Sequence, residues 1–313
     1  MVAFILILAL VAELGFYAWL GLALGVVSAG APAAAVLWCL AGFVSLRAFF
    51  ATLTRLVGRR YRDQTRSGPA IGTWRYLRAV LWDVFCYVLI FSLTQPLEAL
   101  LRPRRQRASQ RPAVLLVHGL WCNGGIWWAL QRRLERAGWV CATMNYAPPL
   151  ASIDAFVPQL AAAIDKLRAD TGAATVHLVC HSMGGLVTRA YLAQPNAASV
   201  ASVITLGTPH HGSGLARWTF GRCVREMRLG SAWLAALNRR EGEQFAVPFV
   251  SVLSWQDNLV TPPTSSVLRG ARNLAIAGVG HVSMPWTAAV QDLVLALLEN
   301  PQAQLPGVET LGD

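Results

Sequence analysis

The first 57 residues contain only three charged side chains, and no other feature restricts the possible folds of this chain as strongly. One apolar run, Val2 to Val27, is 26 residues long and has a single charge, at Glu13. A second run follows a break at residues 28–32 and extends from Ala33 to Val57. A helix of about 20 apolar residues is long enough to cross the hydrocarbon layer of a membrane. The pattern therefore predicts a helical hairpin with transmembrane spans at about 2–27 and 33–57.

A cleavable secretory signal is the alternative interpretation of the first run. Such a signal begins with positive charges and has an apolar core of roughly 7–15 residues. The run here has no basic start, is longer than that core, and is followed directly by a second apolar run. We therefore favour the hairpin and expect residues 1–111 to form a membrane-anchoring region of a multi-pass membrane protein.

The net charge of +11 lies mostly in this N-terminal region, where thirteen Arg face four acidic residues before Pro112. Arginine clusters beside apolar spans are attracted to anionic lipid headgroups, so membrane lipids are the expected partner. Nucleic acid is the other partner that a high positive charge suggests. The sequence has no zinc-ligand spacing, basic helix or aromatic-interleaved basic strand to support it, and we expect no nucleic-acid binding.

The positions of the arginines predict how the chain is oriented. Seven Arg lie between residues 55 and 78, and none lies in the turn at 28–32. The positive-inside rule places both ends of the hairpin in the cytoplasm, which predicts that the rest of the chain lies on the cytoplasmic side of the membrane. A third apolar stretch, Val84 to Leu93, is short and has Arg-rich flanks. We expect an interfacial helix at about 79–101; a crossing there would move the rest of the chain to the other side.

From Pro112 onward, apolar runs without polar alternation repeat between helical stretches. Such runs are typical of parallel strands that are covered on both faces. Alternating strands and helices predict an α/β domain at 112–300, with a doubly wound, mostly parallel sheet, and a C-terminal tail at 301–313. The expected strands are 113–117, 140–146, 176–180, 200–206, 249–255 and 273–277, and the expected helices are 153–170, 185–194 and 284–299.

Ser182 lies between an expected strand and an expected helix, in the segment Cys180-His181-Ser182-Met183-Gly184. Small residues two positions before and after a serine allow the tight strand-to-helix turn that exposes a nucleophilic hydroxyl. Gly184 meets this need fully, whereas Cys180 meets it only approximately. An ordinary strand-to-helix turn is the alternative, but Asp and His candidates follow in the chain order that this chemistry requires.

Those candidates are Asp257 and His281, each in a loop that follows an expected strand. In this interpretation His281 accepts the Ser182 proton as general base, and Asp257 orients the imidazole. The other five histidines fit less well. His181 adjoins the serine and is expected to point to the opposite side of the strand, and the remaining four lie within a strand or turn or precede the acid candidate. Backbone N–H groups of Leu120 and Met183 are expected to form the oxyanion hole.

The segments that carry these residues resemble the lipase and esterase branch of the bacterial α/β-hydrolases. The matching pieces are Val117-His118-Gly119-Leu120-Trp121, His181-Ser182-Met183-Gly184-Gly185 and Leu206-Gly207-Thr208-Pro209-His210-His211-Gly212-Ser213. The third is similar to the segment that precedes the lid of triacylglycerol lipases. The resemblance covers 113–300 and implies an α/β-hydrolase fold, with hydrolysis of carboxylic esters of apolar, lipid-like acyl substrates through an acyl-enzyme and no organic cofactor.

A helical insertion at about 210–247 separates two of the expected strands. It alternates Leu, Trp and Phe with Arg, which is typical of a basic lid that opens at a lipid surface. A fixed cap helix over an apolar pocket is the alternative, and the sequence does not separate the two. We expect no metal site, because the six cysteines are too widely spaced for a Cys-x-x-Cys knuckle and no carboxylate pair for a structural calcium can be mapped.

Two rival functions remain open. An acyltransferase or thioesterase would use the same triad, since an alcohol or a thiol can replace water as acceptor. A membrane scaffold with a degenerate hydrolase domain is disfavoured by the complete Ser182, Asp257 and His281 set. The oligomeric state is not predicted.

Overall fold

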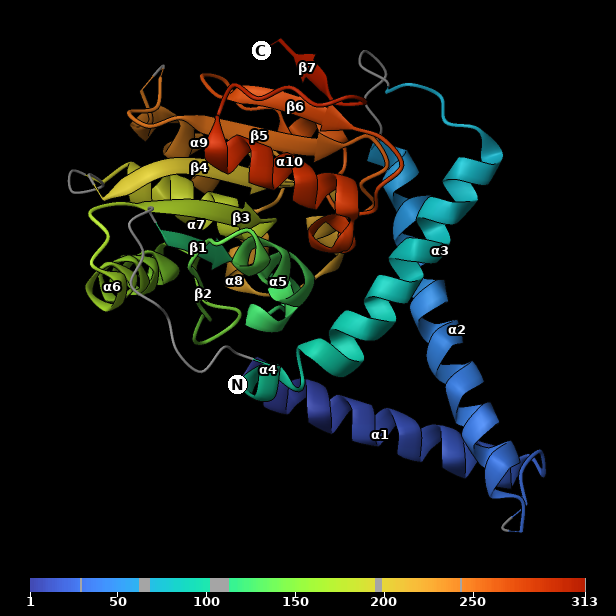
Figure 1. Cartoon of the computed structure of the whole chain (residues 1–313). Coiled ribbons are helices and arrows are strands. Elements are labelled where there is room, and N and C mark those ends of the chain that lie inside the picture. Colours follow the sequence, from blue (N-terminus) through green and yellow to red (C-terminus); the bar gives the residue numbers. More distant parts are fainter. Residues whose placement is uncertain (29, 62–67, 102–112, 195–198, 243, 313) are drawn as a thin grey trace.

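The structure is a computed structural model that describes residues 1–28, 30–61, 68–101, 113–194, 199–242 and 244–312 (Figure 1). The expected boundary between the two regions, at Arg111 and Pro112, lies outside these residues, as do Arg62, Arg66 and the five Arg between 102 and 111.

A sheet of seven strands forms the centre of the C-terminal region, in the order β2-β1-β3-β4-β5-β6-β7. All neighbouring pairs are parallel except β6 and β7. The strands are β1 Ala113–Val117, β2 Cys141–Thr143, β3 Val176–His181, β4 Val200–Leu206, β5 Phe249–Ser254, β6 Arg272–Ile276 and β7 Glu309–Leu311. The mostly parallel doubly wound α/β fold is thus confirmed.

Helices cover both faces of this sheet, and each face has its own apolar core (Figure 1). One core joins the sheet to α6, α7, α8 and α9; the other joins it to α5 and α10 and to Cys86 and Ile90 of the N-terminal region. The helices are α5 Trp128–Arg136, α6 Ile153–Thr171, α7 Met183–Leu192, α8 Arg222–Glu226, α9 Ala232–Arg240 and α10 Ala288–Glu299.

Two differences from the sequence-based expectations lie near the C-terminus. The expected helix 284–299 is divided into a 3-10 turn, Met284–Trp286, and α10, which begins at Ala288. The segment expected to be a tail, 301–313, contains β7, which pairs with β6 in the antiparallel sense and forms an edge of the sheet. The sequence shows no hydrophobic alternation there that would have predicted a strand.

The N-terminal region is helical. Its elements are α1 Val2–Ala23, α2 Pro32–Gly58, α3 Thr73–Leu89, a π turn at Ile90–Thr94 and the short α4 Glu98–Leu101. Pro32 is the first residue of α2, where its missing N–H costs no hydrogen bond. The α1–α2 hairpin points away from the sheet, and α3 returns along the side of the α/β domain (Figure 1).

Three helical segments of this region are long and apolar enough to cross a membrane: Val2–Ala23, Pro32–Tyr61 and Thr73–Thr94. The first covers residues 2–23 of the predicted span 2–27, and the second contains the predicted span 33–57. The third is 22 residues long, so it is longer than the ten-residue stretch on which the interfacial prediction was based. Length alone therefore does not separate a crossing from an interfacial helix for α3.

Candidate active site

Ser182 occupies a strained turn between β3 and α7. Its backbone has φ +56° and ψ −127°, a conformation that non-glycine residues rarely adopt. Gly184 is required here, because a Cβ on it would lie 2.3 Å from the carbonyl oxygen of Val117. Cys180 is fully buried, and its sulfur lies 3.1 Å from Thr188 Oγ1 of α7, so the larger side chain at this position is packed against the helix. The geometry is that of a nucleophile elbow.

Asp257 and His281 are brought together by the loops that follow β5 and β6. His281 Nδ1 lies 2.7 Å from Asp257 Oδ2, and both side chains are buried. The other carboxylate oxygen, Asp257 Oδ1, accepts hydrogen bonds from the backbone N–H groups of Leu259 and Val260, both at 2.8 Å. Because the carboxylate accepts, Nδ1 is the protonated nitrogen, and Nε2 is left with the lone pair that a general base needs.

Ser182 and His281 line the same cavity, which has a volume of about 600 Å³. Most of the lining is apolar and comes from both regions of the chain. It includes Leu120 and Trp121 after β1, Leu215, Ala216, Val224 and Met227 of the insertion, and Leu6, Phe50, Tyr87 and Phe91 of the N-terminal helices. The cavity therefore suits an apolar acyl group next to the serine.

The two expected oxyanion donors lie beside Ser182. Met183 is the first residue of α7, where the backbone N–H has no partner within the helix. Leu120 follows Gly119, and a Cβ on Gly119 would lie 2.7 Å from Ser182 Cβ. This close approach brings the loop after β1 against the serine, and only glycine permits it.

The segment Leu206–Ser213 packs against the candidate site. A Cβ on Gly207, which has φ +56°, would lie 2.9 Å from Asp257 Oδ2 and 3.1 Å from His281 Nδ1. Thr208 Oγ1 donates a hydrogen bond to the Ser182 carbonyl oxygen at 2.8 Å. The segment that carries the lipase resemblance thus contacts all three candidate residues of the triad.

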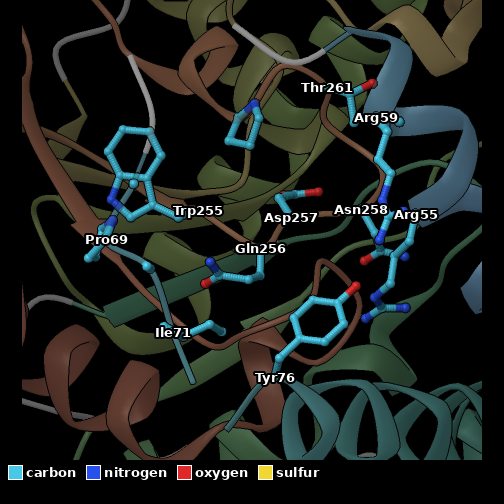
Figure 2. A pocket seen from close by; sticks show the side chains of 14 residues that line it. Arg55, Arg59, Pro69, Ile71, Tyr76, Trp255, Gln256, Asp257, Asn258 and Thr261 are labelled. Carbon is cyan, nitrogen blue, oxygen red and sulfur yellow. The ribbon is translucent and has the colours of Figure 1, made fainter. Parts of the chain in front are cut away.

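Asp257 also borders a second cavity, of about 350 Å³ (Figure 2). It lies where the end of α2 meets the loop after β5, and Arg55, Arg59, Tyr76 and Asn258 line it. Asp257 thus borders this second cavity, whereas its partner His281 borders the cavity that contains Ser182. Within the residues that the structure describes, no three His, Cys, Asp or Glu side chains are grouped as a metal ion would require.

The other histidines have structural partners. His118 Nδ1 lies 2.8 Å from the Gly119 carbonyl oxygen, and His177 Nδ1 lies 2.7 Å from Ser202 Oγ. His210 is fully buried, and burial holds its pKa well below the usual value. His181 differs from its expected orientation: it lines the cavity, its ring lies 4.6 Å from that of His281, and its Nε2 lies 3.0 Å from the His281 carbonyl oxygen.

Burial is the main cause, and the nearby His281 a smaller one, that holds the pKa of His181 well below the usual value, so its ring is neutral. The pKa values of two thiols close to the site are raised. Burial raises that of Cys180 to about 12 and that of Cys122, which lines the cavity, to about 12. A protonated thiol is a poor nucleophile, so these cysteines do not compete with Ser182.

The loop of the histidine is attached to the N-terminal helices, which sequence reasoning did not foresee. The backbone N–H of His281 donates to Asn258 Oδ1 at 3.1 Å, and Asn258 Nδ2 donates to Thr54 Oγ1 of α2 at 2.9 Å. Ser283 N donates to Asp83 Oδ1 of α3 at 3.3 Å, and this buried carboxylate pairs with Arg55 of α2. In the sequence, the signal for this attachment is the presence of two charged residues, Arg55 and Asp83, in otherwise apolar helical runs.

The insertion at 210–247 contains α8, α9 and the 3-10 turn Gly214–Trp218, and its side chains that line the cavity lie between Ser213 and Met227. Val224 and Met227 face the cavity, whereas Trp218 and Phe220 are 66% and 71% exposed. Its apolar side chains thus lie on two sides, one toward the site and one outward.

Part of this sequence is similar to proteins of known family. Residues 112–220 match the family model described as alpha/beta hydrolase fold. In alignments of 121 residues that cover 35% of this chain, the chain is 37% identical to a triacylglycerol lipase of Pseudarthrobacter phenanthrenivorans and to one of Burkholderia plantarii. The matched segment covers 36% and 32% of those lipases, so this chain spans about a third of their length.

Solved structures share the fold. The mature lipase BlEst2 of Bacillus licheniformis has a TM-score of 0.55 at 20% identity, over 63% of this chain and 96% of that one. Lipase B of Aspergillus fumigatus has a TM-score of 0.54 at 19% identity, over 63% and 54%. The chain therefore has the fold of the α/β-hydrolases, and its sequence likeness, over about a third of its length, is to triacylglycerol lipases.

Proposed function

We propose that this protein is a membrane-anchored serine hydrolase that cleaves carboxylic esters of apolar, lipid-like acyl groups. One observation carries the proposal: Ser182 in its strained turn and the hydrogen-bonded pair of Asp257 and His281 border one apolar cavity. The likeness to triacylglycerol lipases points to the same substrate class.

The mechanism follows from the positions of these groups. Ser182 Oγ attacks the ester carbonyl carbon while His281 Nε2 takes the hydroxyl proton. The carbonyl oxygen becomes an oxyanion, which the backbone N–H groups of Leu120 and Met183 stabilise. When the tetrahedral intermediate collapses, the bond to the alcohol oxygen breaks, and His281 gives that oxygen its proton.

The second half of the reaction releases the acid. Water attacks the acyl-Ser182 ester, His281 takes a proton from the water, and the second tetrahedral intermediate expels Ser182 Oγ, which regains the proton. Asp257 stays ionised throughout and stabilises the imidazolium form of His281. An alcohol or a thiol in place of water would give the transferase variant of the same chemistry.

We further propose that the α1–α2 hairpin is inserted in the membrane and that α3 lies at its surface. The polar contacts of α3 with the α/β domain support this: Arg75 donates to the Ala277 carbonyl oxygen, and Trp82 Nε1 donates to Thr287 Oγ1. If α3 crossed, the loops that it contacts would be drawn into hydrocarbon, where polar backbone is costly. With the basic segment after α2 on the cytoplasmic side, the α/β domain is cytoplasmic too.

A fluorescent reporter that folds only in the cytoplasm tests this orientation. Fused after residue 313, it should be fluorescent in intact cells. A dark fusion, together with activity of a reporter that works only outside the inner membrane, would place the domain on the opposite side.

Hydrolysis of p-nitrophenyl esters of graded acyl length tests the activity. The purified wild type should cleave them, and Ser182→Ala should reduce the rate to background. Ser199→Ala is the matched control, since Ser199 precedes β4 at the far end of the sheet and should keep full activity. Product analysis with added alcohol or thiol separates hydrolysis from transfer. A wild type that cleaves no ester, or a Ser182→Ala variant of normal rate, would reject the proposal.

A further inference from the structure

A smaller cavity adjoins the one that contains Ser182 and His281. It has a volume of about 260 Å³, and all its lining residues belong to the N-terminal helices. Four side chains line both cavities: Leu6 of α1, Phe50 of α2, Tyr87 of α3 and Phe91 of the π turn. The two cavities therefore meet at these four residues, and together they form a path from the serine into the helical region.

The far part of this path is apolar until it reaches a charged pair. Ala9, Leu10 and Leu46 line it, and Glu13 and Arg47 lie at the end. Arg47 donates a hydrogen bond to Glu13, and the two side chains are only 13% and 14% exposed. Leu6 and Glu13 are seven residues apart on one helix, so this part adds roughly 10 Å of length. A path of this length with a mostly apolar lining fits an acyl chain.

The surroundings of the path point to the same occupant. The outer faces of α1 and α2 carry exposed apolar side chains, among them Phe4, Leu8 and Val11 of α1. Ala9 lines the cavity and is itself exposed, so the cavity opens sideways toward whatever surrounds the hairpin. In a bilayer that surrounding is hydrocarbon, and an acyl chain can enter from it without passing through water.

We propose that the N-terminal helices form the distal part of the acyl-chain site, so that residues of α1 and α2 set the chain length that the enzyme accepts. The occupant is the long acyl chain of a membrane lipid, with its ester carbonyl at Ser182 and its end directed toward the Glu13–Arg47 pair. This proposal rests on the ester hydrolysis proposed above. It assigns the helices a part in substrate selection in addition to anchoring.

Substituting Ala9 and a matched neighbour tests the proposal in the full-length protein. Ala9→Trp places an indole in the far cavity, whereas Ala12→Trp places it on the same helix, at an exposed residue that lines neither cavity. Leu46→Trp enters the cavity from the opposite wall, and exposed Val44 provides its control, Val44→Trp. The assay compares kcat/KM for p-nitrophenyl acetate and palmitate in micelles of one detergent.

Both cavity variants should keep the acetate rate and lose palmitate activity by about tenfold or more, because each methylene group that loses its contact is worth about fourfold. The two control variants should match the wild type on both esters. If acetate activity fails in Ala9→Trp through misfolding, Leu46→Trp decides. Equal palmitate-to-acetate ratios in cavity variants and controls would overturn the acyl path while leaving the hydrolase intact. A wild type without any ester activity would instead reject the proposed function, and the acyl path with it.

Discussion

Asp83 connects the N-terminal helices to the loop of the candidate general base, and its removal should affect both stability and rate. The side chain is fully buried on α3. Its Oδ2 accepts from Arg55 Nη2 at 2.7 Å, and its Oδ1 accepts from Ser283 N at 3.3 Å. A Cβ on Gly280 would lie 2.3 Å from Oδ1, so the carboxylate packs directly against the residue before His281.

The size of the effect follows from these contacts. Asp83→Ala leaves the Arg55 guanidinium without its partner, and breaking a buried pair costs about 3–5 kcal/mol. Arg55 remains 11% exposed and keeps a hydrogen bond to the Ala51 carbonyl oxygen, so we expect about 3 kcal/mol, the lower end of that range. A displacement of about 1 Å in a reacting group can cost about a hundredfold in rate. We therefore expect kcat to fall by about ten- to a hundredfold.

Chemical unfolding in detergent and kcat for p-nitrophenyl acetate measure the two effects. Asp292→Ala removes one partner of an exposed pair with Arg133 and should cost less than about 1 kcal/mol at unchanged kcat. The double change Arg55→Met with Asp83→Leu should restore much of the stability, since apolar replacement of a buried pair is often neutral. It should leave kcat low, because Ser283 N still lacks its acceptor. Wild-type stability and kcat in Asp83→Ala would refute this account of the contact.

Three further predictions concern the site itself. Asp257→Asn should lower kcat by about four orders of magnitude in a folded protein, because an amide no longer enforces the required histidine tautomer; a loss below tenfold in steady-state kinetics would contradict that role. Gly119→Ala should lower kcat by about a hundredfold or more, because the new Cβ would push the oxyanion loop away from Ser182 while circular dichroism stays unchanged; normal turnover would argue against this donor position. Because the pKa values of Cys122 and Cys180 are raised to about 12, both thiols stay protonated at mildly alkaline pH. Iodoacetamide should therefore alkylate them, by mass spectrometry, only after denaturation, and alkylation of the native protein would speak against this burial.

The fold of the α/β domain was predictable because its strands are continuous apolar runs between turn signals. β4 has the predicted bounds, 200–206, and β1 has the predicted bounds, 113–117. β2 is shorter than its run, since the chain turns away from β1 after Thr143 and only three residues pair. β7 escaped prediction because three residues pair with an edge strand late in the chain, a contact that depends on tertiary position and leaves no local pattern.

The candidate site was predictable in part. The serine turn, acid and histidine could be chosen because each follows a strand, and the ends of parallel strands meet at one edge of a sheet. The orientation of His181 was not, because a residue beside a strained turn does not follow strand alternation. The contacts of Asp83 and Thr54 could not be foreseen either. They join segments about 200 residues apart, and only the docking of the helices onto the α/β domain creates them.

Covalent labelling of Ser182 tests the central claim most directly. A fluorophosphonate probe reacts only with a serine hydroxyl that an adjacent base activates, and mass spectrometry of the digested protein locates the adduct. We predict one adduct per chain, on the peptide that contains Ser182, and no adduct in Ser182→Ala. An unlabelled wild type in its native detergent-solubilised form, or an adduct on another serine, would contradict the account.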